Sequence, residues 1–188
     1  SDLKLLDVCF GLGNNSLATI GAAAGSKNRL NITALEMDKR VVRAAAEFFQ
    51  TLETDPVDWR QILHHLHSDS SFITQNSSVF MHWGDARWLV QNLDDASFDI
   101  VFHDPFSSQH CPELWTVEFF QQLYRVMKPD GVLLTYSSAM PVRGAMREAG
   151  FLTGETKPGH QMGNGTIAAK RPEDIEFPVH LNPDSPRS

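Results

Sequence analysis

The sequence predicts a single α/β domain, with helices on both faces of a mostly parallel, seven-stranded sheet. Short apolar segments typical of buried strands alternate with amphipathic segments of helical period along nearly the whole chain. That alternation is typical of parallel sheets, in which a helix lies in each crossover between strands. The first apolar segment also runs into Gly-Leu-Gly at residues 11–13, which favours a sharp turn from a strand into a helix.

The seven expected strands lie at residues 4–10, 31–36, 78–82, 98–103, 132–136, 151–154 and 166–169. The expected helices lie at residues 14–24, 39–50, 58–66, 86–92, 112–127 and 140–149. Residues 1–171 are therefore expected to form one domain. Residues 172–188 contain repeated prolines without apolar periodicity, and are expected to form an extended C-terminal tail.

The bulk composition is typical of a globular protein, and the length of 188 residues suits one domain with a sizeable core. Because the first strand begins almost at residue 1, we expect the domain to lack an N-terminal segment that a longer protein would supply. The formal net charge of −7 argues against a broad nucleic-acid surface, since phosphate binding relies on clustered Lys and Arg. Cys9 and Cys111 have no metal-ligand spacing, so we expect no metal site and a reducing, cytoplasmic environment.

The first candidate cofactor contact combines a carboxylate with two glycines. Gly11 and Gly13 let the backbone turn and approach a ligand without a Cβ atom in the way. A dinucleotide-binding turn would have a third glycine where Ser16 stands, which weakens an NAD interpretation. Asp7 instead suits the ammonium group in the methionine part of S-adenosylmethionine (AdoMet), bound directly or through water. Asn15 belongs to the same predicted contact, for which an ordinary strand–turn–helix corner is the alternative.

Acidic residues also follow the second and third expected strands. Glu36 is placed to accept both ribose hydroxyls of a nucleoside, with Met37 beside it, whereas Asp38 is better suited to cap the next helix. Asp85 is placed to accept a hydrogen bond from an adenine amino group, with Ala86 next to it. Carboxyl ends of adjacent parallel strands are where α/β sheets bind ligands. Together these anchors predict a Rossmann-like, AdoMet-dependent methyltransferase fold.

The fourth expected strand ends in His-Asp-Pro-Phe at residues 103–106, across the sheet from the first strand. Methyl transfer to nitrogen is a direct displacement, so positioning the acceptor matters more than acid–base chemistry. Asp104 is placed to accept an N–H of an acceptor amine and aim its lone pair, and Phe106 or Trp115 to stack on a flat acceptor. A helix cap followed by a core aromatic residue is the alternative interpretation.

Four short motifs resemble the methyltransferase domain of the MnmC family. They are His-Asp-Pro-Phe-Ser at 103–107, Pro-Glu-Leu-Trp-Thr at 112–116, Thr-Tyr-Ser at 135–137 and Val-Arg at 142–143. The family makes 5-methylaminomethyl-2-thiouridine from 5-aminomethyl-2-thiouridine at the tRNA wobble position, with AdoMet as methyl donor. The resemblance runs from about residue 5 to residue 170.

The resemblance implies a role for several residues. Asp104 would lie beside the methyl acceptor and the cofactor, and Glu36 would hold the ribose. Trp115, Tyr136 and Arg143 would bind the substrate, which would be tRNA. An FAD-dependent oxidase acting on the same nucleoside would be a partner.

Two other functions stay open at the level of the sequence. One is an AdoMet-dependent methyltransferase acting on a small molecule or a protein, which the acidic net charge suits better. The other is a non-catalytic, Rossmann-like binding module. A basic groove beside Asp104 would favour tRNA, a closed pocket would favour a small molecule, and a blocked site would favour the binding module.

Overall fold

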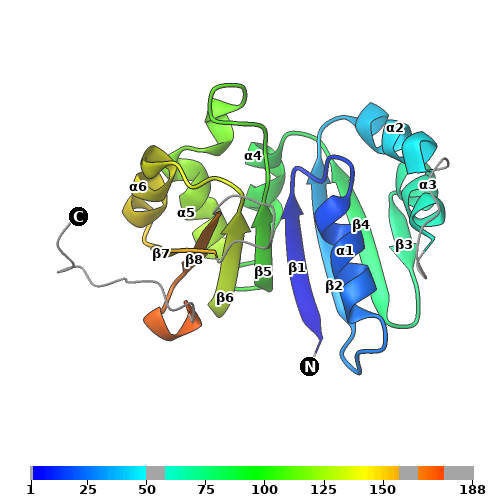
Figure 1. Ribbon diagram of the computed structural model, residues 1–188, viewed down its shortest axis with the longest axis horizontal. Coiled ribbons are helices and arrows are strands. Elements are labelled where there is room, and N and C mark those ends of the chain that lie inside the picture. The colour runs from blue at the N-terminus through cyan, green and yellow to red at the C-terminus, as the bar shows by residue number, and fades with distance from the viewer. Residues whose placement is uncertain (1, 50–57, 157–164, 176–188) are drawn as a thin grey trace.

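The computed structural model describes residues 2–49, 58–156 and 165–175 (Figure 1). Its centre is an eight-stranded sheet in the order β3-β4-β2-β1-β5-β6-β8-β7. The strands are β1 Leu3–Val8, β2 Leu30–Glu36, β3 Ser71–Ile73, β4 Ser77–Trp83, β5 Phe98–His103, β6 Met127–Thr135, β7 Leu152–Glu155 and β8 Thr166–Ala169. The five central strands, β4, β2, β1, β5 and β6, pair in parallel. The predicted mostly parallel α/β sheet is therefore confirmed.

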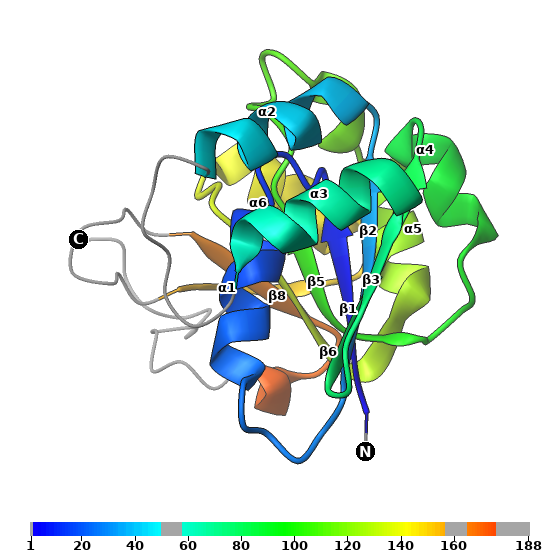
Figure 2. The same cartoon turned by 90° about the vertical axis from the view of Figure 1, so that its right-hand side faces the viewer.

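Helices cover both faces of this sheet, as the sequence predicts. On one face, α1 Asn14–Ala23, α2 Lys39–Phe49 and α3 Trp59–Asp69 share an apolar core with β1, β2 and β4. On the other face, α4 Ala86–Leu89, α5 Val117–Val126 and α6 Met140–Glu148 share a second core with β1, β5 and β6. Figure 1 shows α2 and α3 on one side of the sheet and α5 and α6 on the other, and in Figure 2 α2 and α3 lie toward the viewer.

The eighth strand, β3, is absent from the prediction. It has only three residues, Ser-Phe-Ile, and pairs antiparallel with β4 at the edge of the sheet. Three residues are too few to show the alternation of apolar and polar side chains by which a strand is recognised in a sequence. The count of seven predicted strands is therefore one short, although every predicted strand is present.

Two predicted elements have different boundaries. The helix expected at 112–127 is a 3₁₀ turn, Pro112–Leu114, followed by α5, which begins after Thr116. The Thr116 Oγ1 accepts from the Phe119 N–H at 3.2 Å and so caps α5 as a new helix. Similarly, the helix expected at 86–92 divides into α4 and a 3₁₀ turn, Val90–Asn92.

The Pro-Asp-Gly segment at residues 129–131 lies within β6, where it forms an irregularity. Pairing with β5 jumps from Phe98↔Met127 to Ile100↔Val132, so the residues between Met127 and Val132 leave the ladder. A Cβ atom on Gly131 would lie 2.9 Å from the Phe98 carbonyl oxygen. β6 nevertheless runs without interruption from Met127 to Thr135, so the irregularity bends the strand and does not end it.

The segment expected to be an extended tail begins with ordered structure. Pro172–Asp174 form a 3₁₀ turn, and the Ile175 side chain is only 6% exposed and packs in a small cluster with Ile167 and Ala169 of β8. Residues 176–188 lie outside the described residues. Every helix in the described ranges is too short to cross a membrane.

Replacing Ile175 by Ala should lower the free energy of unfolding by about 2 kcal/mol, because a buried isoleucine is truncated. Urea denaturation of Ile175→Ala measures this change, and Glu173→Ala is the control because Glu173 is exposed in the same turn. Equal stability of Ile175→Ala and the parent chain would show that residues 172–175 contribute nothing to the domain.

Candidate active site

The candidate site lies where the chain reverses its direction of travel across the sheet. From β1 the chain proceeds to β2 on one side, and it later returns to place β5 on the other side of β1. In parallel sheets, such a switch point leaves a crevice at the carboxyl ends of the two central strands. The Asp104 N–H donates to the Val8 carbonyl at 3.3 Å. The residues after β1 and those after β5 are therefore held side by side.

Three left-handed residues shape the loop between β1 and α1. Gly11 and Gly13 have φ angles of 57° and 84°, and Cys9 has 65° although it is not a glycine. A Cβ atom on Gly13 would lie 2.7 Å from the Phe10 ring, so only glycine fits there. A non-glycine residue in this region is strained and is associated with functional sites. The sequence analysis missed Cys9, whose signal is its place in the spacing Asp7-x-Cys9-x-Gly11-x-Gly13.

Helix α1 begins directly after this loop without a capping side chain. The first N–H groups of a helix have no partner within the helix, and together with the helix dipole they attract anions. The described geometry therefore offers donors for a carboxylate such as that of a methionine moiety. Ser16 is not a substitute for a missing glycine, because its Oγ is buried and donates to the Asp7 Oδ2 at 2.5 Å.

Asp7 is fully buried under this helix. Its Oδ1 atom has no hydrogen-bond partner among the described residues. Burial is the main cause that raises the pKa of Asp7 from 3.8 to about 7; the Ser16 hydrogen bond opposes the shift, and the negative charges of Asp104 and Glu36 add to it. A buried, unpartnered carboxylate oxygen is costly unless a donor approaches it. Asp7 therefore fits the predicted ammonium contact, direct or through water.

Glu36 joins the end of β2 to the loop after β1. Its Oε2 accepts from the Gly11 N–H at 2.9 Å, and its Oε1 accepts from the N–H groups of Met37 at 2.8 Å and Asp38 at 2.9 Å. These donors orient the carboxylate; Oε1 already accepts two hydrogen bonds, whereas Oε2 accepts one and keeps further acceptor capacity. The arrangement fits a ribose hydroxyl at Oε2, while the Met37 side chain, 73% exposed, is free to lie against the nucleoside.

Asp85 is first of all a helix cap. It accepts from the Arg87 N–H at 2.9 Å, and both of its oxygens also bind the Arg87 guanidinium at 2.6 to 3.1 Å. The Arg87 hydrogen bonds are the main cause that lowers the pKa of Asp85. An adenine amino group would have to share this carboxylate with Arg87. Ala86 begins α4, where the backbone N–H has no partner within the helix. The adenine contact therefore stays a prediction.

Asp104 faces the cofactor loop from the end of β5. Its Oδ2 accepts from the Asn15 Nδ2 at 2.5 Å, so the side chain predicted for the acceptor touches one predicted for the cofactor. Its Oδ1 has no hydrogen-bond partner in the described part of the chain. One oxygen of Asp104 is thus held, and the other is available to an incoming N–H group.

The aromatic residues around Asp104 divide into exposed and buried. The Phe106 side chain is 81% exposed and Tyr136 is 52% exposed, but Trp115 is only 6% exposed. The Trp115 ring packs edge-on against His103 and Tyr136, with centroids 4.7 Å and 5.9 Å away. Burial of this kind does not favour direct stacking of Trp115 on an acceptor, which stays a prediction. Phe106 keeps that role.

Arg143 is also predicted to contact the substrate. Its guanidinium is buried and forms a salt bridge with Glu155 at 2.8 Å. It also donates to the Thr166 Oγ1 at 3.0 Å and the Gly165 carbonyl at 3.5 Å. Arg143 therefore ties α6 to β7 and β8, and its contact with the substrate stays a prediction. A sequence shows that an arginine is present, but not which carboxylate folding brings to it.

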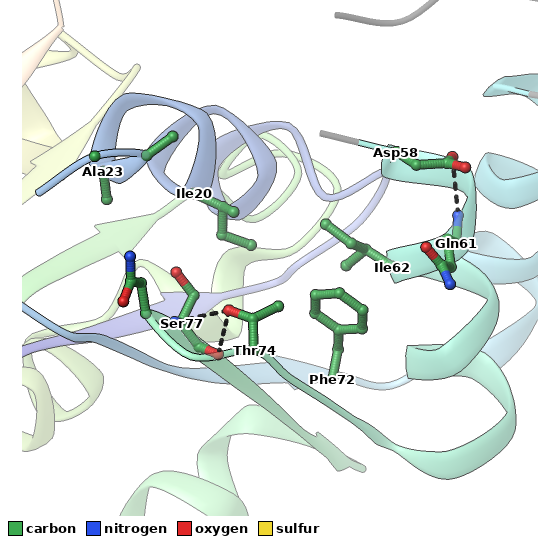
Figure 3. Close-up of a pocket in the computed structure, with 11 residues that line it drawn as sticks. Ile20, Ala23, Asp58, Gln61, Ile62, Phe72, Thr74 and Ser77 are labelled. Atoms are coloured by element: carbon green, nitrogen blue, oxygen red, sulfur yellow. Dashed lines mark hydrogen bonds between the residues drawn. The ribbon is translucent and has the colours of Figure 1, made fainter. Parts of the chain in front are cut away.

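Two further features lie outside this arrangement. No cluster of three or more His, Cys, Asp or Glu side chains suited to a metal ion occurs in residues 2–49, 58–156 and 165–175. A cavity of about 360 Å³ lies near the amino ends of the strands, between α1, α3 and the β3–β4 turn (Figure 3). Within it, Thr74 bonds Ser77 and Asp58 bonds the Gln61 N–H, so these polar groups already have partners.

The sequence was compared with family models and known proteins. Residues 46–171 match the model of a family described as S-adenosyl-L-methionine-dependent methyltransferase. An uncharacterised protein of Methanocaldococcus jannaschii is 29% identical over 92% of this chain and 48% of its own length. The bifunctional protein MnmC of tRNA 5-methylaminomethyl-2-thiouridine biosynthesis from Azoarcus sp. is 30% identical over 78% of this chain and 24% of its own length.

Solved structures agree with these matches. MnmC2 from Aquifex aeolicus superposes with a TM-score of 0.71 and 27% identity, over 90% of this chain and 53% of the other. Human methyltransferase-like protein 13, solved with S-adenosylhomocysteine, has a TM-score of 0.59 at 16% identity, over 92% of this chain and 74% of the other, which supports the fold alone. The chain spans about half or less of the length of the curated relatives named above.

The fold, the three carboxylates at adjacent strand ends and the family match agree. The chain belongs to the family of AdoMet-dependent methyltransferases. Its matches to MnmC proteins in sequence and in structure show that the domain is MnmC-like. The predicted fold class, family and cofactor are therefore confirmed, while the roles of individual site residues remain predictions.

Replacing Glu36 by Ala should weaken AdoMet binding by about 1–3 kcal/mol, because charged hydrogen bonds to the ribose are lost. Titration calorimetry measures the change. Glu47→Ala is the matched control, since Glu47 is an exposed glutamate on α2 that pairs with Arg43. Unchanged affinity in folded Glu36→Ala would remove Glu36 from the cofactor site.

Asp7 should make the ligand-free domain less stable as the pH rises. Because the folded pKa of about 7 exceeds the ordinary value of 3.8, the stabilising contribution is complete below pH 4 and is lost as the pH rises toward 7. At about 1.4 kcal/mol per pKa unit, the loss has an upper limit of about 4 kcal/mol. His103 acts in the opposite direction, since burial lowers its pKa from 6.5 to about 3.

The contribution of Asp7 is therefore isolated as a difference between variants. We expect the free energy of unfolding of the parent chain, relative to Asp7→Asn, to fall between pH 4 and pH 7 in urea denaturation. His103 is the same in both proteins, so its opposite contribution cancels. Parallel pH curves for the two proteins would show that Asp7 does not titrate abnormally.

Proposed function

We propose that this chain transfers the methyl group of AdoMet to the amine of a 5-aminomethyl-2-thiouridine at the wobble position of tRNA. The observation that carries this proposal is the pairing of Asp104, which has one free carboxylate oxygen, with the exposed Phe106 ring two residues later. A carboxylate suits an amine, and an exposed ring suits a flipped-out base. The MnmC relatives act in the biosynthesis of this nucleoside, as their names state.

Bound AdoMet supplies an electrophilic sulfonium methyl group. Asp7, Gly11, Glu36 and the first turn of α1 would hold the cofactor, with Asp85 and Ala86 at its adenine. The Asp104 Oδ1 would accept one N–H of the neutral acceptor amine and direct its lone pair at the methyl carbon. AdoMet would supply the methyl group for the new N–C bond, and its sulfur would keep the electrons of the broken S–C bond. The nitrogen becomes positively charged, and Asp104 stabilises that charge and can receive the released proton.

Several finer expectations belong to this proposal. Residues 1–171 form the catalytic domain, now with Ile175 packed on it, and an N-terminal segment supplied by a longer protein adds contacts to tRNA. An FAD-dependent oxidase acts on the same nucleoside, in line with MnmC relatives whose names call them bifunctional. Two free cysteines and a tRNA substrate are consistent with the cytoplasm.

One observation favours a second candidate. The net charge is −7, and Arg87 and Arg143 are both paired with carboxylates. A small cationic amine would suit such surroundings better than a polyanion. Transfer of labelled methyl groups to small amines, but not to hypomodified tRNA, would select this alternative.

Asp104→Asn should lower kcat by about 100-fold or more, because the amine loses its acceptor and charge partner. AdoMet affinity should change less than twofold. The assay incubates labelled AdoMet with hypomodified tRNA, followed by nucleoside analysis. Asp94→Asn is the matched control, since Asp94 is exposed and precedes the amino end of β5, whereas the site lies at the carboxyl ends of the strands. Equal losses of kcat and AdoMet affinity in Asp104→Asn would assign Asp104 to the cofactor or the fold.

A further inference from the structure

Two aromatic side chains hold consecutive carbonyl groups of the loop that follows β5. The Tyr136 hydroxyl donates to the Pro105 carbonyl at 3.0 Å. The Trp115 Nε1–H donates to the Phe106 carbonyl at 2.8 Å. The two rings also contact each other edge-on, with centroids 5.9 Å apart and an interplanar angle of 86°. The backbone directly after Asp104 is thus held by two hydrogen-bond donors whose rings pack against each other.

A third hydrogen bond, from the buried His103, connects this loop to the core. This residue directly precedes Asp104, is fully buried and bonds the Leu114 carbonyl through Nε2 at 2.9 Å. Because a carbonyl only accepts, Nε2 must carry a proton and donate. Burial lowers the pKa of His103 to about 3, so the ring is neutral at physiological pH. Leu114 is thus bonded to His103, which precedes Asp104, and its neighbour Trp115 is bonded to Phe106, which follows Asp104.

The loop is therefore closed on itself. His103 fixes the segment that carries Trp115, and Trp115 and Tyr136 fix the two residues after Asp104. On its cofactor side, Asp104 is held by Asn15 at 2.5 Å and by the Val8 carbonyl at 3.3 Å. Every side of Asp104 except Oδ1 is thereby restrained.

We infer that Tyr136 and Trp115 are positioning residues, which act through the Pro105 and Phe106 carbonyls to hold Asp104 and the Phe106 ring in place for the acceptor. This inference rests on the proposed function for its kinetic consequence. A displacement reaction depends strongly on alignment, and an error of about 1 Å can cost on the order of 100-fold in rate. Binding of AdoMet depends on other strand ends and should not respond.

Tyr136→Phe tests the inference with the removal of one oxygen atom. We expect kcat for tRNA methylation to fall about tenfold, whereas the KM for tRNA, the Kd for AdoMet and the melting temperature stay nearly constant. Trp115→Phe, which removes the other donor, should give a similar selective loss. The double variant should lose less than the product of the two single losses, because both donors hold one loop.

The chain offers a matched control in its other tyrosine. The Tyr124 ring packs on Phe151 and Lys170, and its hydroxyl has no hydrogen bond within the described residues. Tyr124→Phe should therefore leave kcat unchanged. A rise in the KM for tRNA without a fall in kcat would make Tyr136 a substrate contact and overturn the inference, as would an unchanged kcat in Tyr136→Phe and Trp115→Phe.

Hydrogen–deuterium exchange tests this restraint of the loop without any substrate. In Tyr136→Phe, amides of residues 104–111 should exchange faster than in the parent chain and in Tyr124→Phe, because the loop opens more often. Unchanged exchange in this segment would overturn the inference. A parent chain that does not methylate tRNA would overturn the proposed function instead, and the exchange result would still decide whether the two donors hold the loop.

Discussion

The parallel pairing of β1 with β2 on one side and β5 on the other is the constraint on which the site depends. This pairing places the carboxyl ends of the three strands side by side. The loops that follow the three strands therefore begin close together. Asp7, Glu36 and Asp104 all lie within this small region, although they come from distant parts of the sequence. Burial is the main cause of the raised pKa of Asp7, and repulsion from Asp104 and Glu36 adds to it. A cationic ligand beside these carboxylates would relieve that repulsion.

The sequence predicts the sheet well because strands that are buried on both faces are apolar along their whole length. Continuous apolar segments and intervening amphipathic helices identify seven of the eight strands. The carboxylates at the ends of β1, β2 and β5 are also predictable, because their positions follow directly from strand boundaries. The missed strand, β3, and the division of the helix at 112–127 depend on local pairing and on a cap at Thr116, which short patterns do not resolve.

Side-chain roles are harder to predict because they depend on partners from other elements. Trp115 and Arg143 both belong to motifs that resemble those of the MnmC family, yet the first is buried beneath the loop and the second is paired with Glu155. Both side chains therefore join elements of the domain to one another. Cys9 shows the reverse case, since its left-handed backbone marks a functional loop without a glycine to signal it. The position of a side chain in the folded structure, more than its residue type, decides whether it can contact a ligand or only other parts of the protein.

We propose that the carboxyl ends of β1, β2 and β5 bind AdoMet with its reactive centre toward Asp104. A crystal structure of the chain with S-adenosylhomocysteine tests it most directly. The account predicts the ribose hydroxyls on Glu36, the ammonium on the side of Asp7, and the sulfur atom facing the Asp104 carboxylate. A ligand whose sulfur points away from Asp104, or a ligand bound in the cavity beside Phe72 near the amino ends of the strands, would contradict this binding mode.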